Sequence, residues 1–433
     1  MRFAKILFII SASFLSFTSA SLLYAQDNKD NEFNKAKLLM MEGKYSQSTE
    51  LLKKLLDSDS TNSDIFYYLG LNYQSLSNFQ MASKFLKNAL KLDTGNVKIM
   101  TLLGNDYYSS GRIGDADSIL SKAFSLNSTD SQILLGLGKT YKQEEYWDKA
   151  QAIYERLIKL DSANSFYYEQ IAHCNVKLKK IDEAIINFQI AHRLNLLNQN
   201  TDLQLCELYI SQDKLISASR IIDDGLKAYP SSSVMWTKKG DINLKMKNYD
   251  DAISNYHKSI SLQDSSEINL RNMDVSYYWK GKYDSSVVFL NRAVNIMDKD
   301  PSAYFYLGAS YKSLKEYAQA IDNLFKAVDL QRNDFMAETL IQIAATYYEQ
   351  KNYSQALKYY QGALREKPDK KEITFYLAAV YDHYYKDKTV AIRYYKKFLA
   401  DTTDVDKQLI NYAKDRTETL IEKNHFRKAD TSR

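Results

Sequence analysis

Apolar residues through most of this chain recur at every third or fourth position, which is the spacing of one face of a helix and not the alternation of a strand. The stretch from residue 65 to 95, IFYYLGLNYQSLSNFQMASKFLKNALKLDTG, shows the pattern twice. Its first half carries Leu69, Gly70 and Tyr73. Its second half carries Phe79, Ala82, Leu86, Ala89 and Leu92. The stretch therefore predicts two short amphipathic helices joined by a tight turn.

The same pattern returns every 34 residues, from Ser63 to Val97 and onward. A fixed period of this length indicates stacked units without a single core. The units begin at Lys29, Ser63, Val97, Ser131, Ser165, Gln199, Ser233, Glu267, Pro301, Ala337 and Lys371. Two extra residues precede the unit at Ala337, and one lies in the turn of the last unit near Lys386–Lys388. The sequence predicts about eleven helix-turn-helix repeats over residues 29–404.

Small residues mark where the two helices of each repeat meet. Position 8 is Gly or Ala in most repeats, as at Gly104, and position 20 is Ala in most, as at Ala116. Glycine inside a helix costs about 1 kcal/mol, so its recurrence at one position indicates close packing. Position 11 is Tyr in eight repeats, which we interpret as packing between helices.

This pattern resembles the tetratricopeptide repeat, with small residues at positions 8, 20 and 27 and aromatic residues at positions 11, 17 and 24. The resemblance covers residues 29–404. It implies an all-α, right-handed superhelical α-solenoid whose concave groove is lined by the first helix of each repeat. Residues 405–423 resemble the capping helix that an exposed last repeat requires, and residues 424–433 are expected to be a flexible polar tail.

Residues 1–25 have the order of a secretory signal peptide: Arg2 and Lys5, an apolar core ILFIISASFLSF, then small residues. Cleavage after Ala25 and after Ala20 both fit, and an uncleaved anchor is the alternative. The pattern predicts export, to the periplasm if the source is a Gram-negative bacterium.

Charge and motifs exclude several classes of function. The net charge of +5 comes mainly from the leader and the residues after Lys423, so the repeats are near neutral and nucleic acid is not an expected partner. The five His show no HExxH spacing, and no glycine-rich phosphate loop follows a strand. We expect no enzyme, no cofactor, no metal site and, after signal cleavage, no stable membrane span.

Several residues depart from the repeat or carry separate questions. Asp274 holds the small position 8 of the eighth repeat, so we expect that repeat to be splayed with Asp274 solvated, the alternative being a buried partner. Asp382 and His383 are expected to be a solvated pair. Cys174 and Cys206 fall where neighbouring repeats meet; a disulfide is conceivable, but two buried thiols are favoured.

The resemblance places positions 2, 5, 9, 12 and 13 on the concave face, where two zones stand out. Lys139, Lys142, His173 and Lys177 form a basic zone with Glu169 as the only acid, suited to an acidic peptide or a chain terminus. The second zone is apolar and contains Tyr278, Trp279, Phe305, Ile341, Tyr348 and Phe375. We expect Tyr278, Trp279 and Phe305 to anchor a partner helix or extended segment. The alternative is that the capping helix or a tightening superhelix covers the apolar zone.

Two classes of function follow. The favoured one is an exported, non-catalytic scaffold that binds a peptide segment or partner helix in its groove, for example in envelope assembly or secretion. The alternative is a carbohydrate or cell-wall binding solenoid that stacks sugars on the same aromatics. Neither the partner nor the oligomeric state follows from the sequence.

Overall fold

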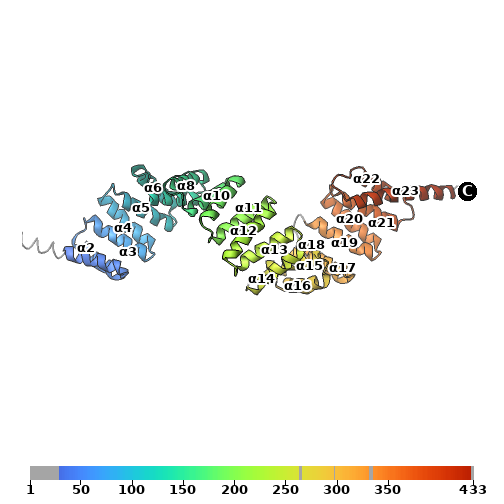
Figure 1. Cartoon of the computed structure of the whole chain (residues 1–433), viewed down its shortest axis with the longest axis horizontal. Helices are drawn as coiled ribbons and strands as arrows, with labels where there is room; N and C mark the ends of the chain where they lie inside the picture. The colour runs from blue at the N-terminus through green and yellow to red at the C-terminus, as the bar shows by residue number, and fades with distance from the viewer. Residues whose placement is uncertain (1–28, 263–265, 297, 331–334, 431–433) are drawn as a thin grey trace, which may run out of the picture. The chain divides into compact units, whose positions relative to one another are not determined.

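The computed structural model describes residues 29–262, 266–296, 298–330 and 335–430, and every regular element in these ranges is a helix (Figure 1). This confirms the all-α prediction. The predicted signal peptide, residues 1–25, lies outside the described residues. None of the described helices is both long and apolar enough to cross a membrane.

The chain divides into two compact units, Met1–Leu208 and Tyr209–Arg433. The first unit begins with helical residues 29–41. It continues with α2 (Tyr45–Ser58), α3 (Ser63–Ser75), α4 (Phe79–Leu92), α5 (Val97–Ser109), α6 (Ile113–Leu126), α7 (Ser131–Gln143), α8 (Trp147–Leu160), α9 (Ser165–Lys177) and α10 (Ile181–Leu194). The boundary between the units falls within α11 (Gln199–Ser211).

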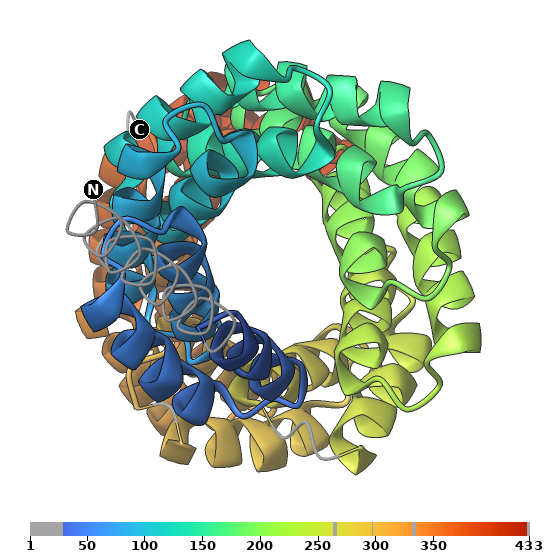
Figure 2. The same cartoon turned by 90° about the vertical axis from the view of Figure 1, so that its left-hand side faces the viewer.

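The second unit continues the same alternation. It contains α12 (Leu215–Ala228), α13 (Ser233–Lys245), α14 (Tyr249–Ser261), α15 (Glu267–Trp279), α16 (Tyr283–Ile296), α17 (Pro301–Ser313), α18 (Tyr317–Leu330), α19 (Met336–Glu349), α20 (Tyr353–Glu366), α21 (Lys371–Tyr384), α22 (Thr389–Leu399) and α23 (Lys407–Asp430). The helix starts match the predicted repeat starts, with α19 beginning one residue earlier than the predicted Ala337. Within each unit the helices form two layers (Figure 2).

Most hairpins share the same local chemistry. Asn62 and Asp130 cap first helices by accepting hydrogen bonds from backbone amides of the first turn. The turn to the second helix passes through one residue with positive φ, such as Gly111 at 77°. The next backbone amide then closes the turn, as when Arg112 donates to the carbonyl of Tyr107 at 2.8 Å. The last repeat has a longer turn, between Tyr384 and Thr389, as predicted.

The small residues at position 8 lie where the two helices touch. A Cβ atom added to Gly104 in α5 would stand 2.4 Å from Cγ of Leu120 in α6. At Gly70 the corresponding distance to Leu86 is 2.6 Å. Both leucines are fully buried. The glycines are therefore required by close packing, as the repeat pattern predicted.

Asp274 does not behave as predicted. Its side chain is fully buried in α15, and neither carboxyl oxygen has a hydrogen-bond partner among the described residues. Burial raises the pKa of Asp274 to about 9, although the charge of Arg292 opposes the shift. The expectation of a solvated Asp274 is wrong: the carboxyl stays in the interior as a neutral acid, which removes the need for a charged partner.

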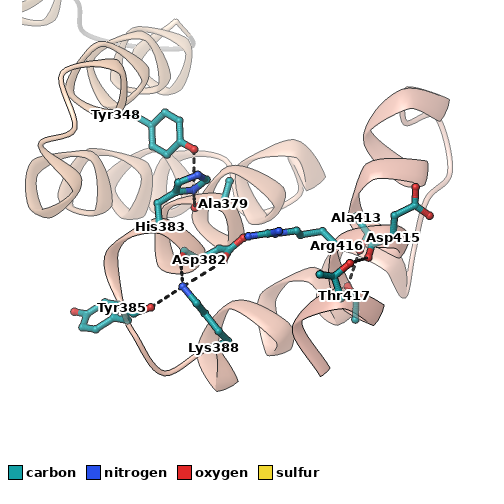
Figure 3. Close-up of polar contacts among 11 residues, drawn as sticks. Tyr348, Ala379, Asp382, His383, Tyr385, Lys388, Ala413, Asp415, Arg416 and Thr417 are labelled. Atoms are coloured by element: carbon teal, nitrogen blue, oxygen red, sulfur yellow. Dashed lines mark hydrogen bonds and ion pairs between the residues drawn. The ribbon is translucent and has the colours of Figure 1, made fainter. Parts of the chain in front are cut away.

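Helix α23 packs on the last repeat where a further first helix would lie, and a buried acid joins the two (Figure 3). Asp382 accepts a 2.6 Å hydrogen bond from Nε of Arg416, and Nζ of Lys388 lies 3.4 Å from its other oxygen. Asp382 is about 1% exposed. The predicted solvated pair is therefore wrong for Asp382, because α23 covers it. The helix also continues past Lys423, where the sequence prediction ended it.

Candidate binding surface

The first helices of successive repeats contact one another, as α5 contacts α7 in the first unit and α13 contacts α15 in the second. We call the surface formed by these first helices the A-helix face. It is the surface on which the sequence placed both candidate zones. The two zones lie in different units and are described separately.

A pocket of about 450 Å³ opens on the A-helix face of the first unit. Lys139 and Lys142 of the predicted basic zone both line it. The other lining residues are Tyr108, Gln143, Tyr154, Phe166 and Gln170. No carboxylate is among them. The pocket thus combines two cations, two amide groups and three aromatic rings.

Burial changes the electrostatics of this zone. Lys142 is half-buried, which lowers the pKa of its ammonium, and its Nζ donates to Oε1 of Gln170. His173 is also half-buried, and burial together with the nearby Lys142 lowers its pKa. His173 is consequently neutral near pH 7, and its ring packs edge-on against Phe188 with centroids 5.2 Å apart. Positive charge in this zone comes from the lysines.

The remaining charged residues of the basic zone do not line the pocket. The Nζ of Lys177 lies 5.8 Å from the ring centroid of Trp147, in a cation–π arrangement. Glu169, the only acid predicted here, accepts a 2.7 Å hydrogen bond from Oγ1 of Thr201 at the start of α11. The structure therefore brings Lys139 and Lys142 together but leaves His173 and Lys177 outside their pocket.

The aromatic zone of the second unit has an exposed centre. Trp279 is 53% exposed, and its ring lies edge-to-face with Tyr278 at 5.3 Å. Tyr306, which the sequence analysis did not select, packs against both rings. Its ring centroid lies 5.4 Å from that of Tyr278 and 6.5 Å from that of Trp279. These three rings come from the C-terminal end of α15 and the first half of α17. We call them the aromatic triad.

Phe305 does not belong to this exposed surface. It is only 7% exposed and packs against Phe335 with ring centroids 4.8 Å apart. Phe335 directly precedes α19, in the connection that the sequence showed to be longer than the others. The extra chain length lets an aromatic side chain fold over Phe305. The expectation that Phe305 is an exposed anchor is therefore wrong.

The last two aromatic positions lie under or beside the capping helix. Phe375 is 8% exposed, and its ring centroid lies 5.7 Å from that of Tyr412 in α23. Tyr348 is half-buried and its hydroxyl lies 3.0 Å from Nδ1 of His383 (Figure 3). The capping helix therefore covers Phe375, which was the alternative to exposure considered for these positions.

Cys174 and Cys206 are both buried thiols and do not form a disulfide. Burial raises the pKa of the Cys174 thiol to about 11, so the reactive thiolate is disfavoured. The favoured sequence prediction is confirmed.

Sequence reasoning missed six contributors to these surfaces, among them Gln143 and Gln170 of the pocket. Tyr108 and Phe166 occupy positions 12 and 2, which the repeat register had already assigned to the groove, so that signal was available. Tyr306 is at position 6 and Tyr154 at position 24, both outside the assigned set. A register rule assigns backbone positions, whereas a tyrosine ring is long enough to reach a surface from a helix behind it.

The fold defines an all-helical repeat protein without strands in its described part. Models of the tetratricopeptide repeat match residues 133–165, 234–266, 301–334 and 336–366. Each match begins within three residues of a predicted repeat start. The chain is a tetratricopeptide repeat protein.

Similar proteins agree with this assignment. A TPR repeat-containing protein of Methanocaldococcus jannaschii is 28% identical over 141 residues, which is 33% of this chain and 24% of that relative. The match thus spans about a quarter of the relative's length.

Solved structures with a similar fold include the APC/C hetero-tetramer Cut9–Hcn1, at 14% identity and a TM-score of 0.48, covering 88% of this chain and 95% of that one. Yeast Tom70 is 15% identical with a TM-score of 0.40, and the match covers 92% of this chain and 97% of that one. YrrB, a TPR protein described as having an unusual peptide-binding site, is 17% identical with a TM-score of 0.37. The match covers 43% of this chain and 95% of that one. All three scores lie below 0.5, so the assignment rests on the repeat models.

Proposed function

We propose that this protein is an exported, non-catalytic scaffold that binds a peptide segment or partner helix on its A-helix face. A tetratricopeptide repeat scaffold is suited to protein–protein interaction, because its stacked helices present an extended surface. The observation that carries the proposal is the aromatic triad. Trp279 remains half exposed beside Tyr278 and Tyr306, which are both partly buried.

A few residues supply most of the binding energy at protein interfaces, and tryptophan and tyrosine are enriched among them. The aromatic triad offers three adjoining rings on one surface, and Tyr278 and Tyr306 are already half-buried and therefore held in place. The basic pocket supplies a separate polar contact for an acidic part of a partner. Envelope assembly and secretion are the processes in which we place an exported scaffold of this kind, and the leader pattern of residues 1–25 supports export.

The test is capture of a stoichiometric partner by the purified full-length chain and by Trp279→Ala. We expect the variant to lose at least tenfold in affinity, as for a central interface tryptophan, with an unchanged circular dichroism spectrum. The matched control is Ile216→Ala on α12, which removes an exposed apolar side chain from a second helix. Equal capture by Trp279→Ala and wild type would contradict the proposal.

A carbohydrate or cell-wall ligand is the second candidate, because an exposed indole ring offers a flat apolar face to a sugar. Binding of purified peptidoglycan separates the two candidates. Retention of the wild type but not Trp279→Ala on peptidoglycan, with no protein partner captured, favours the carbohydrate function. Fractionation of cells, with sequencing of the mature amino terminus, tests export and the choice between Ala20 and Ala25.

A further inference from the structure

A second hollow in the first unit, of about 760 Å³, opens between the second helix α4 and the turn that joins α5 to α6. We call it the outer groove. Its lining residues are Gln80, Met81, Ser83, Lys84, Lys87, Tyr107, Ser110 and Arg112. Three of these residues are cations and none is a carboxylate. The outer groove shares no residue with the pocket on the A-helix face and is a separate site.

Two of the cations lie side by side on α4. Lys84 and Lys87 are three residues apart on this helix, and both side chains are exposed. Neither ammonium group has an ion-pair partner among the described residues. Residues at this spacing are neighbours on a helix surface, where like charges repel each other. The lysine pair therefore does not stabilise α4, and its charge is available to a ligand.

The third cation, Arg112, is held in place by two neighbours. Its guanidinium group lies 4.2 Å from the ring centroid of Tyr107, in a cation–π arrangement. Nε of Arg112 donates a 2.7 Å hydrogen bond to Oδ2 of Asp115, and Nη2 lies 2.6 Å from the same oxygen. A guanidinium group has five N–H donors, so these contacts leave donors for a further acceptor.

The repeat architecture does not require these cations. They occupy positions 22 and 25 of the second repeat and position 16 of the third. At no other junction between repeats are all three of these positions basic. The flanking junctions hold Glu50, Lys53 and Asn78 on one side, and Ser118, Ser121 and Tyr146 on the other. The three cations are therefore a local feature of the outer groove.

We infer that the outer groove binds the dianionic phosphate group of a phosphate monoester, between the ammonium groups of Lys84 and Lys87 and the guanidinium group of Arg112. Three cations less the Asp115 carboxylate leave a net charge of +2. A phosphate monoester matches this charge, because it carries about −1.5 to −2 at pH 7. The planar donors of arginine also fit phosphate oxygens. Met81 in the same lining suits the organic part of an ester.

Two small probes test the required charge. Phenyl phosphate and phenyl sulfate share a ring, but only the phosphate takes a second negative charge, with a pKa of about 6. In calorimetric titrations of the full chain at pH 7.5, phenyl phosphate should bind about fivefold more tightly, the upper range for one exposed ion pair. At pH 5 this difference should nearly vanish. Lysine and arginine side chains ordinarily stay charged over this range, and no histidine lines the groove.

Side-chain variants locate the binding. Lys84→Gln should weaken phenyl phosphate by about fivefold at pH 7.5. Arg112→Lys should also weaken it, because lysine keeps the charge but lacks the planar donors. Lys358→Gln is the matched control, since Lys358 is an exposed lysine at position 22 of the tenth repeat. It removes the same charge elsewhere and should leave the affinity unchanged.

Vesicles identify the source of the phosphate group. Phosphatidic acid is a phosphate monoester, so Lys84-dependent sedimentation with phosphatidylcholine vesicles that contain it, and not with pure phosphatidylcholine, indicates a lipid headgroup. Lys84-dependent binding of phenyl phosphate without vesicle binding indicates a soluble phosphate ester. Either result supports the site.

Three results would overturn the inference. They are no binding of phenyl phosphate, equal affinity for phenyl sulfate at pH 7.5, and equal affinities of Lys84→Gln and Lys358→Gln for phenyl phosphate. The inference goes beyond the proposed scaffold function and does not depend on it, so Lys84→Gln should capture a protein partner as the wild type does.

Discussion

At the scale of single residues, the repeat tolerates little change where its two helices touch. The glycines at position 8 face a large side chain at position 24, as Gly104 faces Leu120. Interiors of proteins are packed as densely as organic crystals, so a side chain added here has no space to occupy. Gly111 and Gly114, in the same repeat as Gly104, have no such constraint, because an added Cβ atom would meet nothing within 4 Å there.

We predict that Gly104→Leu destabilises the protein by about 1–3 kcal/mol, because it overpacks the α5–α6 contact. The measurement is the free energy of unfolding from denaturant titration. Gly114→Ala is the control: an added Cβ meets nothing within 4 Å there, so the change should be neutral or slightly stabilising. Equal stability of Gly104→Leu and the wild type would contradict the packing account.

A second residue-scale prediction concerns Asp274. Its pKa rises from 3.8 to about 9 on folding. The folded state therefore holds a proton that the unfolded state releases above pH 4, so the carboxyl costs stability increasingly between pH 4 and about pH 9. Asp274→Ala, which restores the usual small residue, should raise stability at pH 8 by more than about 1–3 kcal/mol, because the cost of keeping the carboxyl protonated adds to the cost of an unpaired buried polar group.

The gain should fall to its smallest value below about pH 3, where the carboxyl is protonated in both states and only the cost of the unpaired polar group remains. Thermal midpoints of both proteins across this pH range supply the measurement. Ala344→Asp places the same group at position 8 of the tenth repeat and should destabilise with the same pH dependence. A gain from Asp274→Ala that is independent of pH would show that its size, and not its ionisation, is what costs stability.

At the scale of elements, helices and their order were predictable because the local signals repeat. The positions of Gly, Ala and Tyr fixed the register, and the described first helices of the repeats start within one residue of it. The environments of individual side chains were harder to predict from the sequence. Phe305 is buried by a residue from an irregular connection, Asp382 by α23, and Tyr154 reaches the pocket from the layer behind. Each depends on a contact between segments that the period does not describe.

The attachment of α23 gives an element-scale prediction. Arg416 neutralises the buried Asp382, so Arg416→Ala leaves that carboxylate with Lys388 alone. We expect a loss of about 3 kcal/mol or less, since removal of one partner of a buried pair costs up to 3–5 kcal/mol and Arg416 is 31% exposed. Hydrogen exchange should accelerate in α23 and α21.

Lys414→Ala is the control on the same helix, because Lys414 is exposed. It should leave exchange in α23 unchanged. If Arg416→Ala also left exchange unchanged, the apolar contacts of Ala413 and Leu420, both fully buried, would be sufficient to hold the capping helix.

At the scale of the whole molecule, stability and function are distributed along the repeats. Each helix packs mainly against its neighbours in sequence, so stability is close to a sum over repeats and their interfaces. The A-helix face carries both candidate zones. On it, the described structure retains an exposed tryptophan and a pocket lined by two lysines.

The central claim is that this face, and not the outer surface of the second helices, binds the partner. Site-specific photo-crosslinking tests it most directly, with the crosslinking residue placed at Lys139 or Trp279 and, as controls, at the exposed Ile186 of α10 or Ile216 of α12. We predict one common partner crosslinked from Lys139 and Trp279 and not from the control sites. Crosslinks to that partner from Ile186 and Ile216 alone would contradict the account.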